Sequence, residues 1–312
     1  MNIHRLRLFV AVTDHGGFSR AAEAFYISQP AVSAQIQRLE QELEVSLFQK
    51  VGREVRLTEA GEALYYYAVR ILALCDDAVE TIAQLRETKR RRIRIAATTT
   101  PGVYVLPRLI EQLTAHNPEL RIEIDIGNRE YVLARIESFQ SDLGLVAGAV
   151  EDEGFRVTPI MEDELLPVGA KGSSLAQMER VTLEEFAVQR LFLREAGSAT
   201  RDRIDQVFRA RGLTAFNVTE LPNTEAIKQA LLSGHGYAVV PRLAVKPEIE
   251  KGLLSVINVF EFHLRRSISL VVSKESQSST IVRTNLDAVR AAIASLALEG
   301  ALDIKSEEVG PQ

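Results

Sequence analysis

The sequence predicts an α+β multidomain protein, because three unlike patterns follow one another along its 312 residues. Short amphipathic helical stretches fill residues 1–58, one long helical stretch fills 59–88, and strand-like and helical stretches alternate from 89 to 312. The alternating part, about 220 residues, is larger than one small α/β unit, so we expect it to form two lobes with a cleft between them.

Residues 18–43, FSRAAEAFYISQPAVSAQIQRLEQEL, predict two short helices joined by a tight turn. In the second helix, Gln29, Ser33 and Gln37 recur every four residues and therefore share one face. On periodicity alone, an amphipathic surface helix is the simpler interpretation. Amide and hydroxyl groups on a free helix face, however, suit the reading of base edges in a DNA major groove. The opposite, apolar face consists of Val32, Ile36, Leu39 and Leu43.

Residues 49–57, QKVGREVRL, predict a two-stranded hairpin with its turn near Gly52 and Arg53. Three basic residues lie on this hairpin within seven positions. A basic hairpin beside a groove-reading helix is typical of a winged helix-turn-helix, whose wing contacts phosphates or the minor groove. The candidate DNA-binding residues are Ser28, Gln29, Pro30, Ser33, Ala34, Gln37, Arg38, Lys50, Arg53 and Arg56.

About the first 60 residues resemble the amino-terminal signature of the LysR-type transcriptional regulators. The matching motifs are FSRAAEA, SQPAVS, QIQRLE and LF, followed by RxxxLTEAG from Arg53 to Gly61. The chain departs from the family pattern at Ala34 and Gln37, where many members carry Arg, although Ala34 can still touch a thymine methyl group. The resemblance implies a cytoplasmic regulator that binds double-stranded promoter DNA, with RNA polymerase as a further candidate partner.

The reading head is scarcely basic, although the chain is expected to bind DNA. Residues 1–58 hold seven Lys or Arg and six Asp or Glu, and the whole chain has a formal net charge of −5. Affinity must therefore come from the placement of a few cations, namely Arg38, Lys50, Arg53 and Arg56. Binding should still weaken with salt, because each phosphate that is neutralised releases counterions.

The long helical stretch has an apolar seam but no core of its own. Its apolar residues keep the three-four spacing of a coiled coil, so it must bury them against a partner. The resemblance implies that the partner is the same helix of a second subunit, giving a dimer through residues 58–88 and a tetramer of two dimers. Packing on the chain's own carboxy-terminal domain is the alternative. The seam consists of Leu64, Tyr67, Ile71, Leu74, Ala78 and Leu85.

The remainder of the chain predicts a mostly parallel sheet covered by helices on both faces. Expected strands are 93–98, 120–126, 142–148, 164–169, 190–193 and 237–240, and expected helices are 103–116, 199–211 and 224–233. The resemblance implies an effector-binding domain like the two-lobed periplasmic solute-binding proteins, in which the chain crosses twice between the lobes. On that analogy, lobe one takes about 93–162 and 266–298, and lobe two takes about 163–265.

Two hydroxyl-rich loops predict an anion site between the lobes. The segments 98–102, TTTPG, and 197–201, GSATR, each follow a strand and precede a helix. Ligands in such folds bind beyond the carboxyl ends of strands, so we expect a small anionic metabolite there, such as a carboxylate or phosphorylated acid. Plain N-capping by Thr and Ser is the alternative. The candidate effector-binding residues are Thr98, Thr99, Thr100, Gly102, Gly148, Gly197, Ser198, Thr200 and Thr224.

Parts of this region, the GSATR loop and residues 224–229, look like the regulators of carbon or sulfur assimilation. A small-molecule enzyme or a solute-binding receptor with an added DNA-binding head is the rival interpretation. The sequence has no GxSxG elbow, metal-ligand spacing, P-loop or GxGxxG after a strand. It begins MNIHRLRLF, without an apolar secretion signal, and has no 18-residue apolar span. We therefore expect no catalytic residue, metal, cofactor or membrane contact.

Overall fold

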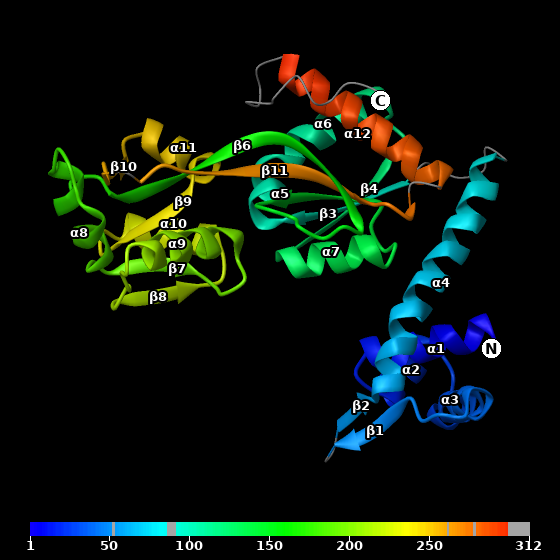
Figure 1. The fold of residues 1–312 in the computed structure, drawn as a ribbon. Coiled ribbons are helices and arrows are strands. Elements are labelled where there is room, and N and C mark those ends of the chain that lie inside the picture. Colours follow the sequence, from blue (N-terminus) through cyan, green and yellow to red (C-terminus); the bar gives the residue numbers. More distant parts are fainter. Residues whose placement is uncertain (52–53, 86–91, 261, 277–278, 299–312) are drawn as a thin grey trace. The chain divides into compact units, whose positions relative to one another are not determined.

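The computed structural model describes residues 1–51, 54–85, 92–260, 262–276 and 279–298 (Figure 1). The chain separates into two compact units. The first contains Met1–Lys89 and Glu137–Gln140, and the second contains Arg90–Ile136 and Ser141–Gln312.

The first unit is a winged helix-turn-helix followed by a long helix, as the sequence predicts. A buried cluster that includes Leu6, Phe9 and Leu47 joins the first three helices to the hairpin and to the start of the long helix. The two hairpin strands pair antiparallel. The elements are α1 (Ile3–Asp14), α2 (Phe18–Ala24), α3 (Gln29–Leu43), β1 (Phe48–Val51), β2 (Glu54–Leu57) and α4 (Glu59–Leu85).

Helix α3 begins where its capping residues predict. The Ser28 hydroxyl accepts a hydrogen bond from the Ala31 amide at 3.4 Å, and Pro30 lies in the first turn, where its missing N–H group leaves no hydrogen bond unmade. The predicted apolar face is confirmed except at its end, because Leu43 is 36% exposed. The helix ends there, since Glu44 adopts a left-handed φ of 56°, and this last position extends past the core.

The apolar residues of helix α4 form two groups, one packed against the core and one exposed. Leu64 and Ile71 pack against the core of the first unit, so the prediction that both belong to a free seam is wrong. Other apolar side chains of the same helix are exposed, and they include Tyr67, Leu74, Val79 and Ile82. The first turns of α4 therefore complete the core of the reading head, and an apolar surface remains further along the helix.

The second unit is built on one mixed sheet with the strand order β4-β3-β5-β11-β6-β9-β7-β8, and β10 pairs with β6. The elements on its amino-terminal side are β3 (Arg92–Thr98), α5 (Thr99–Tyr104), α6 (Leu106–His116), β4 (Arg121–Gly127), α7 (Arg129–Glu137), β5 (Leu143–Ala147) and β6 (Phe155–Ala170). Those that follow are η1 (Ser174–Gln177), α8 (Leu183–Ala187), β7 (Leu191–Arg194), α9 (Ala199–Ala210), β8 (Val218–Leu221), α10 (Thr224–Leu232), β9 (Tyr237–Pro241), α11 (Arg242–Glu250), β10 (Leu254–Val256), β11 (Leu264–Ser273) and α12 (Thr280–Leu298).

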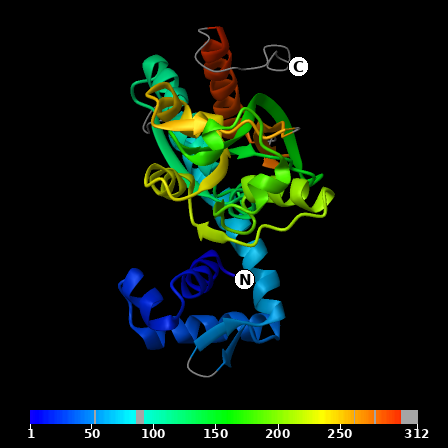
Figure 2. The same cartoon turned by 90° about the vertical axis from the view of Figure 1, so that its left-hand side faces the viewer.

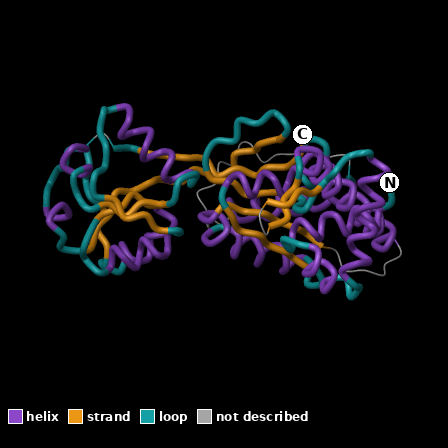
Figure 3. Tube along the Cα trace, turned by 90° about the horizontal axis from the view of Figure 1, so that it is seen from below, coloured by secondary structure: helices purple, strands orange, loops and turns teal. Residues whose placement is uncertain are grey.

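The long strands β6 and β11 join two lobes (Figures 1 and 3). Lobe one holds β3, β4 and β5 with the helices α5, α6, α7 and α12, and lobe two holds β7, β8 and β9 with α8 to α11. In lobe one, β3 pairs in parallel with both β4 and β5. In lobe two, β7 pairs in parallel with both β8 and β9. The two long strands pair antiparallel with each other and with β5 and β9, so the expectation of a mostly parallel sheet holds only for the outer strands.

Each lobe has its own core on both faces of its strands. Helices lie on both sides of the strands of lobe two, which faces the viewer in Figure 2. In lobe one, α12 packs beside α6 and contributes Leu286, Val289 and Ile293 to the core. The helix expected at 103–116 is two helices, because the chain bends at Val105 between α5 and α6.

Candidate functional site

A cleft of about 320 Å³, including its open mouth, lies between the two lobes of the second unit. Lobe one lines it with the carboxyl ends of β3, β4 and β5, and lobe two with the end of β7 and the start of α9. Six of the nine predicted effector-binding residues line this cleft. They are Thr98, Thr99, Thr100, Gly197, Ser198 and Thr200.

The other three predicted residues lie behind the cleft wall. A Cβ at Gly102 would come within 2.8 Å of Ile126, so the glycine lets α5 pack on β4. Gly148 has a φ of +94°, and a Cβ there would lie 3.1 Å from that of Ala199, so this glycine permits the close approach of α9. Thr224 is buried and accepts a hydrogen bond from Arg194 at 3.3 Å.

The hydroxyl groups of the cleft are not helix caps, although capping was the alternative. Thr98 and Ser198 occupy the N-cap positions of α5 and α9, but neither side chain bonds a helix amide. The Thr98 hydroxyl instead accepts from the Ala147 amide at 2.9 Å. The start of α10 is capped by Asn223, which accepts from Ala226. Capping therefore does not explain why hydroxyl side chains line this cleft.

Most cleft hydroxyls keep a proton to donate. Thr98, Thr100 and Thr200 each accept a hydrogen bond from an N–H group, and a hydroxyl that accepts in this way still has its own O–H donor. None of the described residues accepts a hydrogen bond from these three, and Thr99 and Ser198 make no side-chain hydrogen bond within the described chain. The cleft therefore offers O–H donors to a ligand that supplies acceptor atoms.

Arg266 lies at the floor of the cleft and joins both lobes. It is on β11, opposite Asp163 on β6, and its guanidinium donates to one Asp163 oxygen at 2.8 and 3.0 Å. It also donates to Thr100 of lobe one and Thr200 of lobe two, at 2.9 Å each. The Arg266 and Asp163 side chains are 3% and 0% exposed. Burial raises the pKa of Asp163 and lowers that of Arg266, and the attraction between them opposes both shifts.

Arg194 is the second buried arginine at the cleft. Its Nε and Nη2 atoms donate to both oxygens of Glu195, at 2.7 and 2.6 Å, and Nη1 donates to Thr224. Burial raises the pKa of Glu195, but the hydrogen bonds from Arg194 and from the residue's own amide, together with the positive charge of Arg194, outweigh it and hold that pKa below the usual range. The cleft wall also includes Arg129, which reaches Asp202 of lobe two at 3.3 Å.

A second set of contacts joins the lobes through α5 and α10. The Tyr104 hydroxyl donates to the Glu225 carboxylate, which also binds Lys228 at 3.2 Å. Lys228 in turn pairs with Glu248 of α11 at 2.8 Å. Burial first, and then the hydrogen bond to Glu225, raises the pKa of Tyr104, so the phenol stays protonated. A relative movement of the lobes must break or re-form the contact between Tyr104 and Glu225.

The charged residues of the cleft were missing from the sequence-based prediction. Arg194 ends β7, one residue beyond the strand expected at 190–193, and Arg266 lies in β11, where no strand was expected. The sequence does contain a pattern that indicates these residues. Asp163 lies in the acidic run EDE at 162–164, and Arg266 lies in a basic pair at 265–266. Each of the two is next to a run of strand-forming residues. Charges inside strands that are covered on both faces require partners.

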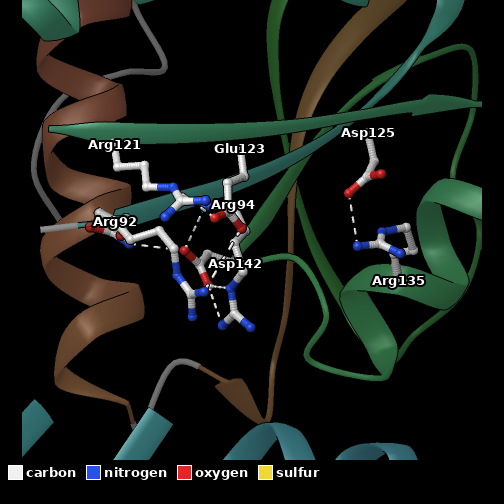
Figure 4. Close-up of polar contacts among 8 residues, drawn as sticks. Arg92, Arg94, Arg121, Glu123, Asp125, Arg135 and Asp142 are labelled. Carbon is white, nitrogen blue, oxygen red and sulfur yellow. Dashed lines mark hydrogen bonds and ion pairs between the residues drawn. The ribbon is translucent and has the colours of Figure 1, made fainter. Parts of the chain in front are cut away.

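A separate buried network ties lobe one together at the amino-terminal end of β3 (Figure 4). Asp142 accepts hydrogen bonds from the Arg94 amide and from its guanidinium, at 2.9, 3.0 and 2.7 Å. It also accepts from Asn285 of α12 at 2.9 Å. The network lies at the other end of β3 from the cleft, so its role is to fix β3, β5 and α12 together.

In the reading head, the predicted base-reading residues share an accessible face of α3. Gln29 donates to the Ser33 hydroxyl at 2.9 Å, so these two side chains are held together. Gln29 and Gln37 are exposed, and Ser33 is half-buried. Ser28, Pro30, Ala34 and Arg38 are exposed as well. Direct contact with bases is sterically open to this set.

The three basic residues of the wing differ from one another. Lys50 is exposed and forms no ion pair with any described residue, and the same holds for Arg38 on α3. Arg56 is paired with Glu54 at 2.9 Å on the hairpin, which offsets its charge. Arg53 lies outside the described residues. Lys50 and Arg38 are therefore the better candidates for phosphate contacts among the residues whose structure is described.

The turn between α2 and α3 carries a residue that the sequence-based prediction missed. Tyr26 has a left-handed φ of 54° and is 96% exposed. A non-glycine residue in this region costs about 1 kcal/mol or more, and the exposed ring gains little from burial. An exposed aromatic residue beside the reading helix can contact a DNA backbone, so Tyr26 joins the candidate DNA-contacting residues.

Within the described chain, no three or more His, Cys, Asp or Glu side chains are grouped so that they can hold a metal ion. No helix that the structure describes has the length and apolar character that a membrane span requires.

Both parts of the chain match known protein families. Residues 3–62 match the bacterial regulatory helix-turn-helix protein, lysR family, and residues 86–294 match the LysR substrate binding domain. The activator CmpR of a Synechocystis species is 30% identical over 91% of this chain and 93% of its own length. The regulator CysL of Bacillus subtilis is 30% identical over 86% of this chain and 90% of its own.

A solved structure shares the fold over nearly the full length. Full-length CbnR complexed with its target DNA has a TM-score of 0.67 and 20% identity, covering 94% of this chain and 100% of that chain. The relatives CmpR and CysL are named as a transcriptional activator and a transcriptional regulator. The chain therefore belongs to the LysR family of DNA-binding transcriptional regulators, with an amino-terminal helix-turn-helix domain and a carboxy-terminal effector-binding domain.

Proposed function

We propose that a small anionic metabolite binds in the cleft between the lobes and modulates the binding of this regulator to promoter DNA. One observation carries the proposal. Hydroxyl donors of Thr98, Thr99, Thr100, Ser198 and Thr200 converge on one cleft and have no acceptor among the described residues. Arg194 and Arg266 bring two guanidinium groups to the same place, each of them paired with a carboxylate of the protein. A carboxylate or phosphorylated acid supplies both the acceptor atoms and the opposite charge.

The coupling to DNA runs through the packing of the lobes in this proposal. The effector would touch Thr99 of lobe one and Ser198 of lobe two, while Arg266 already spans both lobes. An effector that prefers one lobe arrangement shifts the equilibrium by its difference in affinity for the two arrangements. A coupling free energy of about 1–3 kcal/mol is enough to switch a promoter.

The regulator also self-associates in this proposal, through the exposed apolar side chains of α4 that include Tyr67, Leu74 and Ile82. A dimer through residues 58–88, and a tetramer of two dimers, would present paired reading heads to an inverted repeat. The proposed division is a reading head at 1–58, a linker helix at 59–88 and an effector domain at 89–312. The proposed regulator works in the cytoplasm, with RNA polymerase as a further candidate partner.

We assign the target genes to carbon or sulfur assimilation. The names of the relatives support this assignment, since several are named as RuBisCO transcriptional regulators, among them one from Allochromatium vinosum that is 31% identical over 89% of this chain. Small phosphorylated acids and inorganic oxyanions both fit a cleft lined by hydroxyl donors and arginines, so both classes belong in a first binding screen.

The effector proposal predicts the result of removing two cleft hydroxyls. Thr100 is unsuitable for substitution because it also accepts a hydrogen bond from the buried Arg266, whereas the side chains of Thr99 and Ser198 bind no described residue. In a thermal-shift screen of the full chain against inorganic phosphate, sulfate and small organic acids, we expect at least one anion to stabilise the wild type. Thr99→Val with Ser198→Ala should weaken the binding of that anion by more than about 100-fold, because each hydrogen bond to a charged group contributes about 1.5–3 kcal/mol.

The control for this double variant is Thr219→Val with Ser255→Ala, which makes the same chemical changes in lobe two away from the cleft. The control should bind the anion like the wild type. Equal binding by the two double variants would contradict the assignment of the cleft as the anion site.

The DNA-reading face predicts a loss of sequence preference when Gln29 is replaced. Gln29→Ala should cost about 1–3 kcal/mol at one base pair of the site, because Gln bonds adenine at two points. The change should not destabilise α3, since Ala favours a helix at least as well as Gln. Fluorescence anisotropy on the promoter site and on single-base variants measures the effect. Gln41→Ala, an exposed Gln at the opposite end of α3 from Gln29, is the control, and an equal loss on cognate and scrambled DNA would refute the base contact.

A further inference from the structure

Each arginine that lines the cleft is already paired with a carboxylate. The pairs are Arg129 with Asp202 at 3.3 Å, Arg194 with Glu195 at 2.6 and 2.7 Å, and Arg266 with Asp163 at 2.8 and 3.0 Å. The positive charge of the cleft is therefore balanced before any ligand enters. An anion that is to gain an arginine must take the place of a carboxylate of the protein itself.

The three pairs differ in how readily the carboxylate can leave. Asp163 is fully buried, and its partner Arg266 also holds two threonines, so this pair is fixed. The pair between Arg129 and Asp202 has a single contact, and Asp202 does not line the cleft. Glu195 lines the cleft with a side chain that is 32% exposed, while its partner Arg194 is only 7% exposed. Glu195 is thus the carboxylate that can turn out to solvent.

We infer that Glu195 is a built-in competitor of the effector, holding the place on Arg194 that the effector's oxyanion takes. Its two oxygens accept from Nε and Nη2, which is the side-by-side arrangement that a carboxylate or phosphate ligand also uses. The third nitrogen, Nη1, is tied to Thr224, so the guanidinium is held in place and keeps the same edge toward the cleft. This inference rests on the proposed anion site.

The competitor also restricts which anions the cleft accepts. A ligand must present two oxygens in one plane to replace the Glu195 carboxylate on Arg194, and further acceptor atoms for the threonine and serine hydroxyls. Phosphate, sulfate and carboxylates meet the first requirement, and chloride does not. Because Arg194 is buried, it cannot be left without a partner when Glu195 moves, so only an anion that replaces Glu195 fully is bound.

The test compares the wild type, Glu195→Gln and the matched variant Glu220→Gln in the full chain, with inorganic phosphate as the probe in isothermal titration. Glu220 is in the same lobe, is 57% exposed and does not line the cleft. Glutamine keeps the size of residue 195 but has no negative charge to compete. We expect Glu195→Gln to bind phosphate about tenfold tighter than the wild type, and Glu220→Gln to bind it like the wild type. Chloride should show no gain.

Phosphate affinity that is unchanged or weaker in Glu195→Gln overturns the inference. A weaker affinity would mean that Glu195 recognises a ligand group that donates hydrogen bonds. The double variant Thr99→Val with Ser198→Ala separates this failure from that of the proposed function. If it weakens phosphate binding while Glu195→Gln equals the wild type, the anion site stands and the competitor does not. If Glu195→Gln binds phosphate and the double variant in its background binds it equally well, the site is elsewhere and both ideas fail.

Discussion

Replacing Arg266 by methionine is expected to lower the free energy of unfolding of the second unit by about 3–5 kcal/mol, because it leaves a buried carboxylate without its cation. Asp163 is 0% exposed, and one of its oxygens already has no hydrogen-bond partner in the described chain. Thr100 and Thr200 would also lose their shared donor. Equilibrium denaturation of the full chain measures the loss.

The neighbouring residue supplies the control for this experiment. Arg265 is 70% exposed and pairs with Glu162 at 3.5 Å, so Arg265→Met should change stability by less than about 1 kcal/mol. Adding Asp163→Leu to Arg266→Met should restore part of the stability, because an apolar pair of similar size removes the unpaired charge. Equal effects of the Arg265 and Arg266 substitutions would show that the buried pair does not hold the lobes together.

Replacing Asp142 by alanine is expected to have the second largest effect, about 3–5 kcal/mol, because its carboxylate serves two buried partners. Arg94 is 13% exposed and Asn285 is 0% exposed, so neither can turn to water without a local rearrangement. Strand β3, strand β5 and helix α12 would lose their shared contact. Denaturation of the full chain measures the change, with loss of α12 packing visible by hydrogen exchange.

Asp125 is the control for Asp142, since it pairs with Arg135 in the same lobe at 2.8 Å. That pair is accessible, with side chains 37% and 25% exposed, so Asp125→Ala should cost at most about 1 kcal/mol. If Asp142→Ala costs no more than this control, the buried network does not fix lobe one.

The sequence predicted the reading head well because local rules decide it. Helix α3 begins at a Ser cap with Pro30 in its first turn, and its buried positions follow the helical period. The same rules failed at Leu43, because this last position of the helix extends past the core. They also failed to divide the apolar residues of α4, because periodicity identifies a face and does not identify which partner covers it.

The cleft was predicted in part, and the missing part is non-local. Both loops were found because Thr and Ser clusters between a strand and a helix are local features. Arg266 was not found, because it lies 166 residues from its partner Thr100 in the sequence. It reaches the cleft only because β11 pairs antiparallel with β6, and a short sequence pattern does not reveal that pairing. Likewise the mostly parallel sheet was expected from alternating strands and helices, and the two crossing strands break that alternation.

The most direct test of this account measures whether an anion in the cleft changes the affinity for DNA. Promoter binding of the wild type and of Thr99→Val with Ser198→Ala is followed by anisotropy as the anion from the screen is added. Ionic strength is held constant with chloride, because salt alone weakens DNA binding. We predict that the anion changes wild-type affinity by about 5- to 150-fold and leaves the variant's affinity unchanged, with equal DNA binding when no anion is present. A variant that responds like the wild type would contradict the account.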